Sequence, residues 1–310
     1  MQAPEGSGQR FTTLFMLVLV VVVSGIAPLF VTSSGFDVFQ VHPGDDLRPK
    51  IHLWLTLIIV QAALWVVCVF YLVSNFLRIK AGTAEPARSM KAAGINLLPP
   101  GLLLVIFVAQ QFLRPPPLPP QQLSIYNISR LHWFRAIGML VAGWAVWEMY
   151  WIGSIWEAEF ASSGPQPEKI SKYVERREDV LRLLLLAAVV LALGTLAGAA
   201  LRSAVNSDQR YEYFAEEYII IYGAVYSLLL FVAYVPVYAK FFTTGVKLRE
   251  LLCGQPPATA ADFKPWKEAR DAINDSLGLT LSSAAALGPP LSALLPIMAA
   301  WAASLLEAKK

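Results

Sequence analysis

Charged residues are scarce in this chain, and their scarcity is typical of a membrane protein. Only 15% of the 310 residues are Asp, Glu, Lys or Arg, against about 25% in an ordinary soluble domain. The deficit is concentrated in long apolar runs, which are typical of helices that cross a lipid bilayer. The net charge is only +3 and no basic block occurs, so we expect the bilayer, and no nucleic acid, as a partner.

Cysteine and catalytic motifs are scarce as well. Cys68 lies in an apolar run and Cys253 in a charged segment, and without a CxxC spacing they predict neither a structural zinc site nor a redox pair. The HExxH, GxSxG, P-loop and Rossmann glycine patterns are missing. No carboxylate pair or Ser–His pair falls at matched membrane depth. We therefore expect a protein that is not an enzyme and has no cofactor.

Six apolar runs are each long enough to cross a bilayer, for which about 20 residues suffice. They are Phe11–Val31, Ile51–Leu77, Ile95–Leu113, Phe134–Ile155, Val180–Ala204 and Tyr218–Phe242. A seventh run, Leu287–Leu306, contains three prolines, so it either spans with a kink or enters and returns. The sequence thus predicts an all-α, polytopic integral membrane helix bundle of six to seven transmembrane helices, forming a single domain over residues 1–310.

Lys and Arg are distributed unevenly between the two sides of this predicted bundle. With a cytoplasmic N-terminus, 16 of them fall inside and 7 outside, leaving the last two lysines unassigned. An excess of positive charge inside is the usual orientation, so we expect the N-terminus in the cytoplasm. Two cytoplasmic segments should be helical. Glu168–Arg182 continues the fifth membrane helix, and a short amphipathic helix within Arg249–Asp275 lies in the headgroup layer or packs on its neighbour.

Glu148 is the one ionisable residue deep within a predicted span. It falls within roughly 6 Å of the centre of the Phe134–Ile155 run, at 1.5 Å per residue. A lipid-facing carboxylate costs about 2.5–3.5 kcal/mol, so we expect Glu148 to face the bundle, a pore or a partner subunit. Trp144, Trp147 and Trp151 share its helix face. Glu148 is thus an ion site, a proton site or part of a charge ring, unless it is a neutral hydrogen-bonded group or lies nearer the headgroups.

Other polar side chains within the runs also need partners. Tyr222 and Tyr226 share one face of their run, while Tyr234 and Tyr238 lie on nearly the opposite face. Gln61 lies in the middle of the second run, and we expect it to form a hydrogen bond across helices. Tyr222 and Tyr226 either pair with Gln61 or Glu148 along a pore, or pack between helices.

Small residues and histidines complete the set of candidates. Gly194 and Gly198 form a GxxxG pattern, which predicts a close helix contact within one chain or between subunits. His42, His52 and His132 are the metal-ligating candidates, but their spacing fits no metal-binding motif, so we expect no metal site.

These features favour a non-enzymatic multi-pass membrane protein, and within that class an oligomeric channel or pore-type transport subunit. One alternative is an accessory or scaffold subunit of a larger membrane complex, which the lack of distinctive chemistry favours. Another is a secondary transporter, although the chain has no internal repeat. The expected protein partners are further copies of the chain or other subunits of a membrane complex. Runs rich in Ala and Leu favour a bacterial inner membrane or another plasma-type membrane.

Overall fold

The described part of the chain is built from helices and their connections. The computed structural model describes residues 6–31, 47–82, 128–162, 166–207, 217–257, 260–279 and 291–308, together with Gly101 and Gly164. No strand occurs among these residues. Apart from Gly101, the predicted Ile95–Leu113 span lies outside them.

The helices have the following bounds. In chain order they are α1 (Gly6–Val31), α2 (Leu47–Gly82), α5 (Ile128–Ser162), α6 (Gln166–Ser207), α7 (Glu217–Cys253), α8 (Ala260–Leu277) and α10 (Leu295–Ala308). By length and composition, α2, α5, α6 and α7 are able to cross a membrane, whereas α1 and α10 contribute shorter apolar helices. The expectation of an α-helical protein suited to a membrane is confirmed to this extent.

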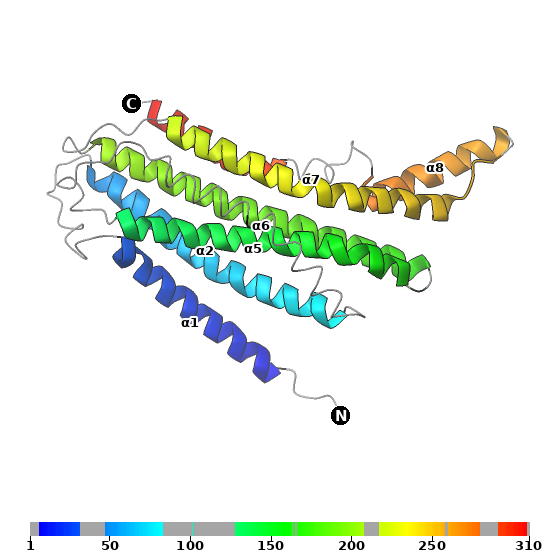
Figure 1. The fold of residues 1–310 in the computed structure, drawn as a ribbon, viewed down its shortest axis with the longest axis horizontal. Helices are drawn as coiled ribbons and strands as arrows, with labels where there is room; N and C mark the ends of the chain where they lie inside the picture. Colours follow the sequence, from blue (N-terminus) through cyan, green and yellow to red (C-terminus); the bar gives the residue numbers. More distant parts are fainter. Residues whose placement is uncertain are drawn as a thin grey trace.

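The four long helices lie side by side as one bundle (Figure 1). α2, α5 and α7 run in one direction and α6 runs in the opposite direction (Figure 1). α6 packs against α2, α5, α7 and α10, so it is the central helix. α1 packs on the outside of α2, and α10 packs against α6 and α7.

α6 is much longer than a bilayer requires. Its 42 residues extend about 63 Å at 1.5 Å per residue, about twice the thickness of the hydrocarbon core. Its charged first part is stabilised by two pairs one turn apart, Glu168–Lys172 and Glu178–Arg182, each at 2.9 Å. Glu168 in the first turn also suits the helix dipole. The predicted continuation of the fifth span through Glu168–Arg182 is therefore confirmed.

Glycines end both α7 and α8. Gly254 and Gly278 each have a φ of 63°, a left-handed conformation that glycine adopts without steric penalty. α8 confirms the predicted amphipathic helix. Its Trp266 indole donates a hydrogen bond to the Cys253 carbonyl at the end of α7 over 3.1 Å, while Phe263 is 47% exposed. One aromatic ring of α8 is thus tied to α7 and the other is left on the surface.

A glycine also permits a close contact between α7 and α10. A Cβ at Gly223 of α7 would lie 2.7 Å from the Pro296 carbonyl oxygen and 2.8 Å from the Ala300 Cβ, both in α10. Next to this contact, the Ile297 backbone N–H donates a hydrogen bond to Ser227 Oγ over 3.1 Å. The C-terminal apolar run therefore packs along the first half of α7.

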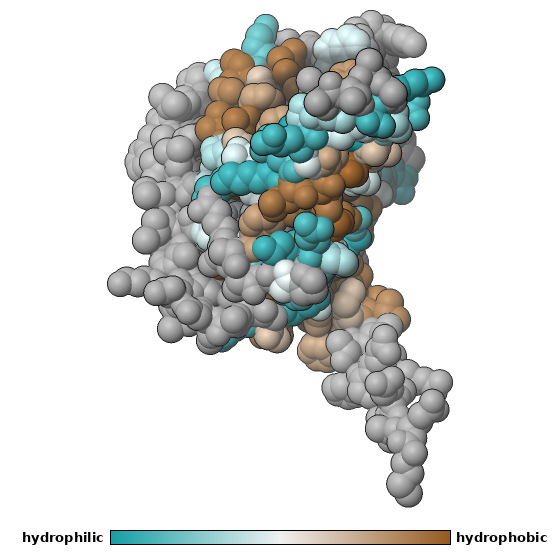
Figure 2. Space-filling view, turned by 90° about the vertical axis from the view of Figure 1, so that its right-hand side faces the viewer, coloured by the Kyte–Doolittle hydropathy of each residue, from teal (hydrophilic) through white to brown (hydrophobic). Residues whose placement is uncertain are grey.

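Hydrophilic side chains gather at the end of the bundle where α2, α5 and α7 end and α6 begins. Figure 2 looks onto this end and shows hydrophilic side chains interleaved with apolar ones. Ion pairs of α6 lie here, including Glu178–Arg182 and the contact between Arg78 of α2 and Glu175. In the predicted orientation this end faces the cytoplasm.

Candidate functional site

Glu148 lies inside the bundle of a single chain. It belongs to α5, and its exposed fraction is 0%. Asn75 of α2 donates its Nδ2 to Glu148 Oε2 over 2.9 Å. Oε1 is also buried and has no hydrogen-bond partner within the described ranges. The carboxyl group therefore faces α2, and not lipid or the surface of the chain.

Several aromatic residues are close to Glu148 and Asn75 in the chain. Trp147 and Trp151 stack with their ring centroids 6.0 Å apart, and Phe76 of α2 lies 4.9 Å from Trp151. The Trp144 indole nitrogen lies close to the Glu148 carboxyl, but the geometry falls short of a hydrogen bond. A buried carboxylate is poorly solvated, so the Glu148 carboxyl group is either protonated and neutral, or charged with a cation or further hydrogen-bond donors nearby.

A chain of hydrogen bonds connects Glu148 with buried charges on α6. Asn75 Oδ1 accepts a hydrogen bond from Arg78 over 2.8 Å. Arg78 in turn binds Asp179 of α6 over 2.5 Å and also contacts Glu175. Asp179 is only 1% exposed. This arrangement joins α5, α2 and α6 through polar groups at the charged end of the bundle.

A second arginine, Arg176, adds to the charged groups around Asp179. Arg176 binds Glu159 of α5 through two hydrogen bonds of 3.0 and 2.9 Å, and its NH1 lies 3.7 Å from Asp179 Oδ2. We call the whole set the charged network: Asn75, Arg78, Glu148, Glu159, Glu175, Arg176 and Asp179. It holds four carboxyl groups and two guanidinium groups. Because Glu148 is the one carboxyl that touches neither arginine, it is the member best placed to bind a proton or a cation.

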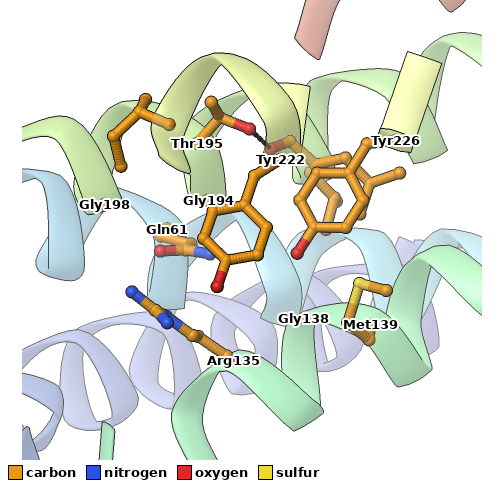
Figure 3. Close-up of a pocket in the computed structure, with 12 residues that line it drawn as sticks. Gln61, Arg135, Gly138, Met139, Gly194, Thr195, Gly198, Tyr222 and Tyr226 are labelled. Carbon is orange, nitrogen blue, oxygen red and sulfur yellow. Dashed lines mark hydrogen bonds between the residues drawn. The ribbon is translucent and has the colours of Figure 1, made fainter. Parts of the chain in front are cut away.

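A second polar site lies between α2, α5, α6 and α7. It is a cavity of about 50 Å³, and its polar lining comes from Gln61, Arg135, Thr195, Tyr222 and Tyr226 (Figure 3). We call it the polar cavity. By the general size requirement for buried water, this volume has room for a few molecules. Each of the four helices contributes at least one polar side chain to it.

Three of the predicted pore residues meet at this cavity, and one does not. Gln61, Tyr222 and Tyr226 all line it, and the two tyrosine rings stack with centroids 6.4 Å apart. Glu148 belongs to the charged network instead, so the tyrosines do not pair with it. Gln61 is 5% exposed and has no hydrogen bond with another described residue, so the expected bond across helices stays a prediction.

Gly194 and Gly198 also line the polar cavity. A Cβ at Gly194 would lie 3.3 Å from Gln61 Nε2, and one at Gly198 would lie 3.9 Å from Arg135 NH2. The GxxxG pattern therefore faces neighbouring helices of the same chain. The two glycines leave room for the polar side chains of α2 and α5.

An apolar layer separates the polar cavity from the charged network. On α2, Gln61 and Asn75 are 14 positions apart, a separation of about 21 Å. The layer consists of side chains that are at most 3% exposed, including Cys68, Leu72, Ala145, Leu184 and Ala188. No polar route joins the two sites across these residues.

The histidine candidates do not form a metal site. His52 is exposed on α2, while the side chains of His42 and His132 lie outside the described set. Where side chains are described, no three His, Cys, Asp or Glu residues lie close enough to hold a metal ion.

Three comparisons with known proteins gave no match: no family model, curated protein or solved structure matches the chain. Its function must therefore be argued from the chemistry of the charged network and the polar cavity.

Eight polar residues of these two sites were not identified from the sequence, namely Asn75, Arg78, Arg135, Glu159, Glu175, Arg176, Asp179 and Thr195. Arg78 and Arg135 were counted only as charges that set the orientation, and Asn75 and Asp179 were not singled out. A local signal was present for part of the set, because Asn75 and Arg78 lie three positions apart at the end of an apolar run. Such a pair presents two polar groups on one helix face.

Proposed function

We propose that this chain is a multi-pass membrane protein with a transport-type function, whose route for an ion or small polar solute runs through its own helix bundle. The supporting observation is that the polar cavity and the charged network follow the same α2–α5–α6 interface. Polar groups inside a membrane bundle are costly and usually mark ion or substrate pathways. Here they come from helices long and apolar enough to span a bilayer.

The proposal includes the predicted topology of six to seven crossings with a cytoplasmic N-terminus. In that orientation the polar cavity lies toward the outer side of the membrane. The charged network lies toward the cytoplasm, at the end where hydrophilic side chains gather (Figure 2). A solute would thus meet Gln61 and the tyrosines before Glu148.

The apolar layer implies a closed conformation. Buried side chains such as Leu72 and Leu184 fill the space between the two polar sites. Passage therefore requires a movement of α2, α5 and α6 relative to one another. Such a movement would break the hydrogen bond from Asn75 to Glu148. This contact would therefore stabilise the closed conformation.

An oligomeric pore is the less favoured arrangement of the route. Glu148 and Gln61 both face the interior of one chain, so neither is placed to line an axis between copies. Association into homo-oligomers or with other membrane subunits remains part of the proposal as a property of the lipid-facing surface. The mass of the detergent-solubilised particle gives the number of subunits directly.

The test is flux into liposomes that contain the purified full-length protein. Dyes for protons, potassium and chloride would report transport in wild type, Glu148→Gln and Glu178→Gln. We expect Glu148→Gln to change the rate at least severalfold. The matched control Glu178→Gln removes a carboxylate that is 53% exposed and should leave the rate unchanged.

Equal rates in all three proteins and in empty liposomes would refute the transport proposal. If the inactive protein also co-purified with other membrane proteins at a fixed ratio, it would be an accessory subunit instead.

A further inference from the structure

The polar cavity contains a cation without a described counter-ion. Arg135 of α5 reaches the cavity, and no described Asp or Glu side chain forms an ion pair with it. In Figure 3 the Tyr222 hydroxyl points toward the Arg135 guanidinium group, and the Gln61 amide lies beside both. A guanidinium group in a partly enclosed site favours an anion or strongly bound water as its neighbour.

The remaining side chains make the cavity rich in donors. The Gln61 amide is 5% exposed and unpartnered within the described residues, so its N–H groups are available. The hydroxyls of Tyr222 and Tyr226 can each donate one hydrogen bond. Thr195, in contrast, already donates to the Leu191 carbonyl over 2.9 Å (Figure 3). Arginine, amide and phenol donors together suit an anion far better than a metal cation.

The size of the cavity limits which anion fits. About 50 Å³ accommodates a few water molecules, which is enough for a halide, nitrate or formate ion. We infer that the polar cavity is a binding site for a small monovalent anion. Arg135 supplies the charge, Gln61 orients the ion, and the two tyrosines complete its coordination. This inference goes beyond the proposed function, because the anion would bind in the polar cavity whether or not the chain transports an ion.

The two glycines of α6 give the site its space. A methyl group at Gly194 would press against Gln61 Nε2 from 3.3 Å, which is closer than an ordinary van der Waals contact. Gly194→Ala should therefore displace the amide and weaken anion binding, although Arg135 and its charge remain in place. If Gly194 serves only helix packing, Gly194→Ala should leave anion binding unchanged.

Chloride binding to the full-length protein in lipid nanodiscs tests the inference. The linewidth of the chloride NMR signal would be measured with increasing sodium chloride, with sodium gluconate holding ionic strength constant. Nitrate and formate would serve as competitors. We expect saturable broadening in wild type, competition by both small anions, and binding at least about tenfold weaker in Arg135→Gln, since hydrogen bonds to charged groups are the strong ones.

Two further variants separate binding from folding. Arg48→Gln removes an exposed positive charge from the first turn of α2 and should bind chloride like wild type. If Arg135→Gln fails to fold, the double variant Tyr222→Phe/Tyr226→Phe keeps all charges and should bind chloride severalfold more weakly.

The inference is overturned if wild type shows no saturable broadening, or if Arg135→Gln and the tyrosine double variant both bind like wild type. Its failure is distinct from failure of the proposed function. Chloride binding without flux in liposomes would support the anion site and refute the transport proposal. Flux of protons or potassium that depends on Glu148, without chloride binding, would support the transport proposal and refute the anion site.

Discussion

Replacing Arg78 with methionine measures how strongly the charged network holds α2 to α6. Arg78 binds Asp179 over 2.5 Å, and removing one partner of a fully buried ion pair costs about 3–5 kcal/mol because the other charge stays buried. Here the Arg78 side chain is 45% exposed and that of Asp179 is 1% exposed, so water screens one side of the pair. We therefore expect Arg78→Met to lower the free energy of unfolding by about 2 kcal/mol.

A double-mutant cycle identifies the cause of this loss. Asp179→Asn removes the charge that Arg78→Met leaves buried, so the double variant should be more stable than the sum of the two single effects predicts. We expect a coupling free energy of about 1–2 kcal/mol. The matched control is Arg182→Met, which breaks an ion pair whose side chains are 61% and 53% exposed and should cost at most about 0.5 kcal/mol.

Unfolding in mixed micelles, followed by tryptophan fluorescence, provides the assay. The chain has nine tryptophans, and several lie in the core that α5 forms with α2. If the effects of Arg78→Met and Asp179→Asn add within about 0.5 kcal/mol, the two residues do not interact as the structure shows and the reasoning is refuted.

Three further predictions concern other parts of the molecule. Gly223→Ala should lower the free energy of unfolding by about 1–3 kcal/mol, because its Cβ would meet an α10 carbonyl oxygen at 2.7 Å. Gly25→Ala, with open space around it, should instead be neutral or stabilise by up to about 1 kcal/mol. Glu148→Leu should cost about 1–3 kcal/mol in the same assay, because an amide of α2 loses its acceptor. A membrane-impermeant maleimide should label Cys253, and only from the cytoplasmic side of oriented vesicles, whereas buried Cys68 should be labelled only after unfolding, as mass spectrometry would show.

Each of these has a contrary outcome. Equal effects of the two alanine substitutions would show that α10 does not pack on Gly223. A Leu variant as stable as wild type would show that the contact to Glu148 contributes nothing. Labelling of Cys253 from the outer side would invert the proposed topology.

Features that depend on neighbouring residues in the chain could be predicted from the sequence. The extension of α6 follows from Glu168–Lys172 and Glu178–Arg182 pairs one turn apart, and α8 follows from its amphipathic pattern. The long apolar runs likewise predicted α2, α5, α6 and α7. These signals are local, so they need no knowledge of how the helices pack.

Partner choice across helices could not be predicted in the same way. The sequence indicated that Glu148 needs a partner, but Asn75 was one of several polar groups at a suitable depth. The convergence of Gln61 with Tyr222 and Tyr226 was foreseen as one of two alternatives, whereas Arg135 was assigned to the outer side. The rotation of each helix about its axis decides these contacts, and many weak apolar interactions set that rotation jointly.

The bond between Arg78 and Asp179 also constrains how the protein is made. Its two residues are 101 positions apart in the chain, and ribosomes add about 5–20 residues per second. For roughly 5–20 seconds after Arg78 emerges, its eventual partner therefore does not exist. In the proposed orientation, α2 would keep the arginine at the cytoplasmic water boundary during that interval, and this would stop the helix from sliding deeper into the bilayer. Once α6 has been made, the ion pair between Arg78 and Asp179 would hold α2 in this position.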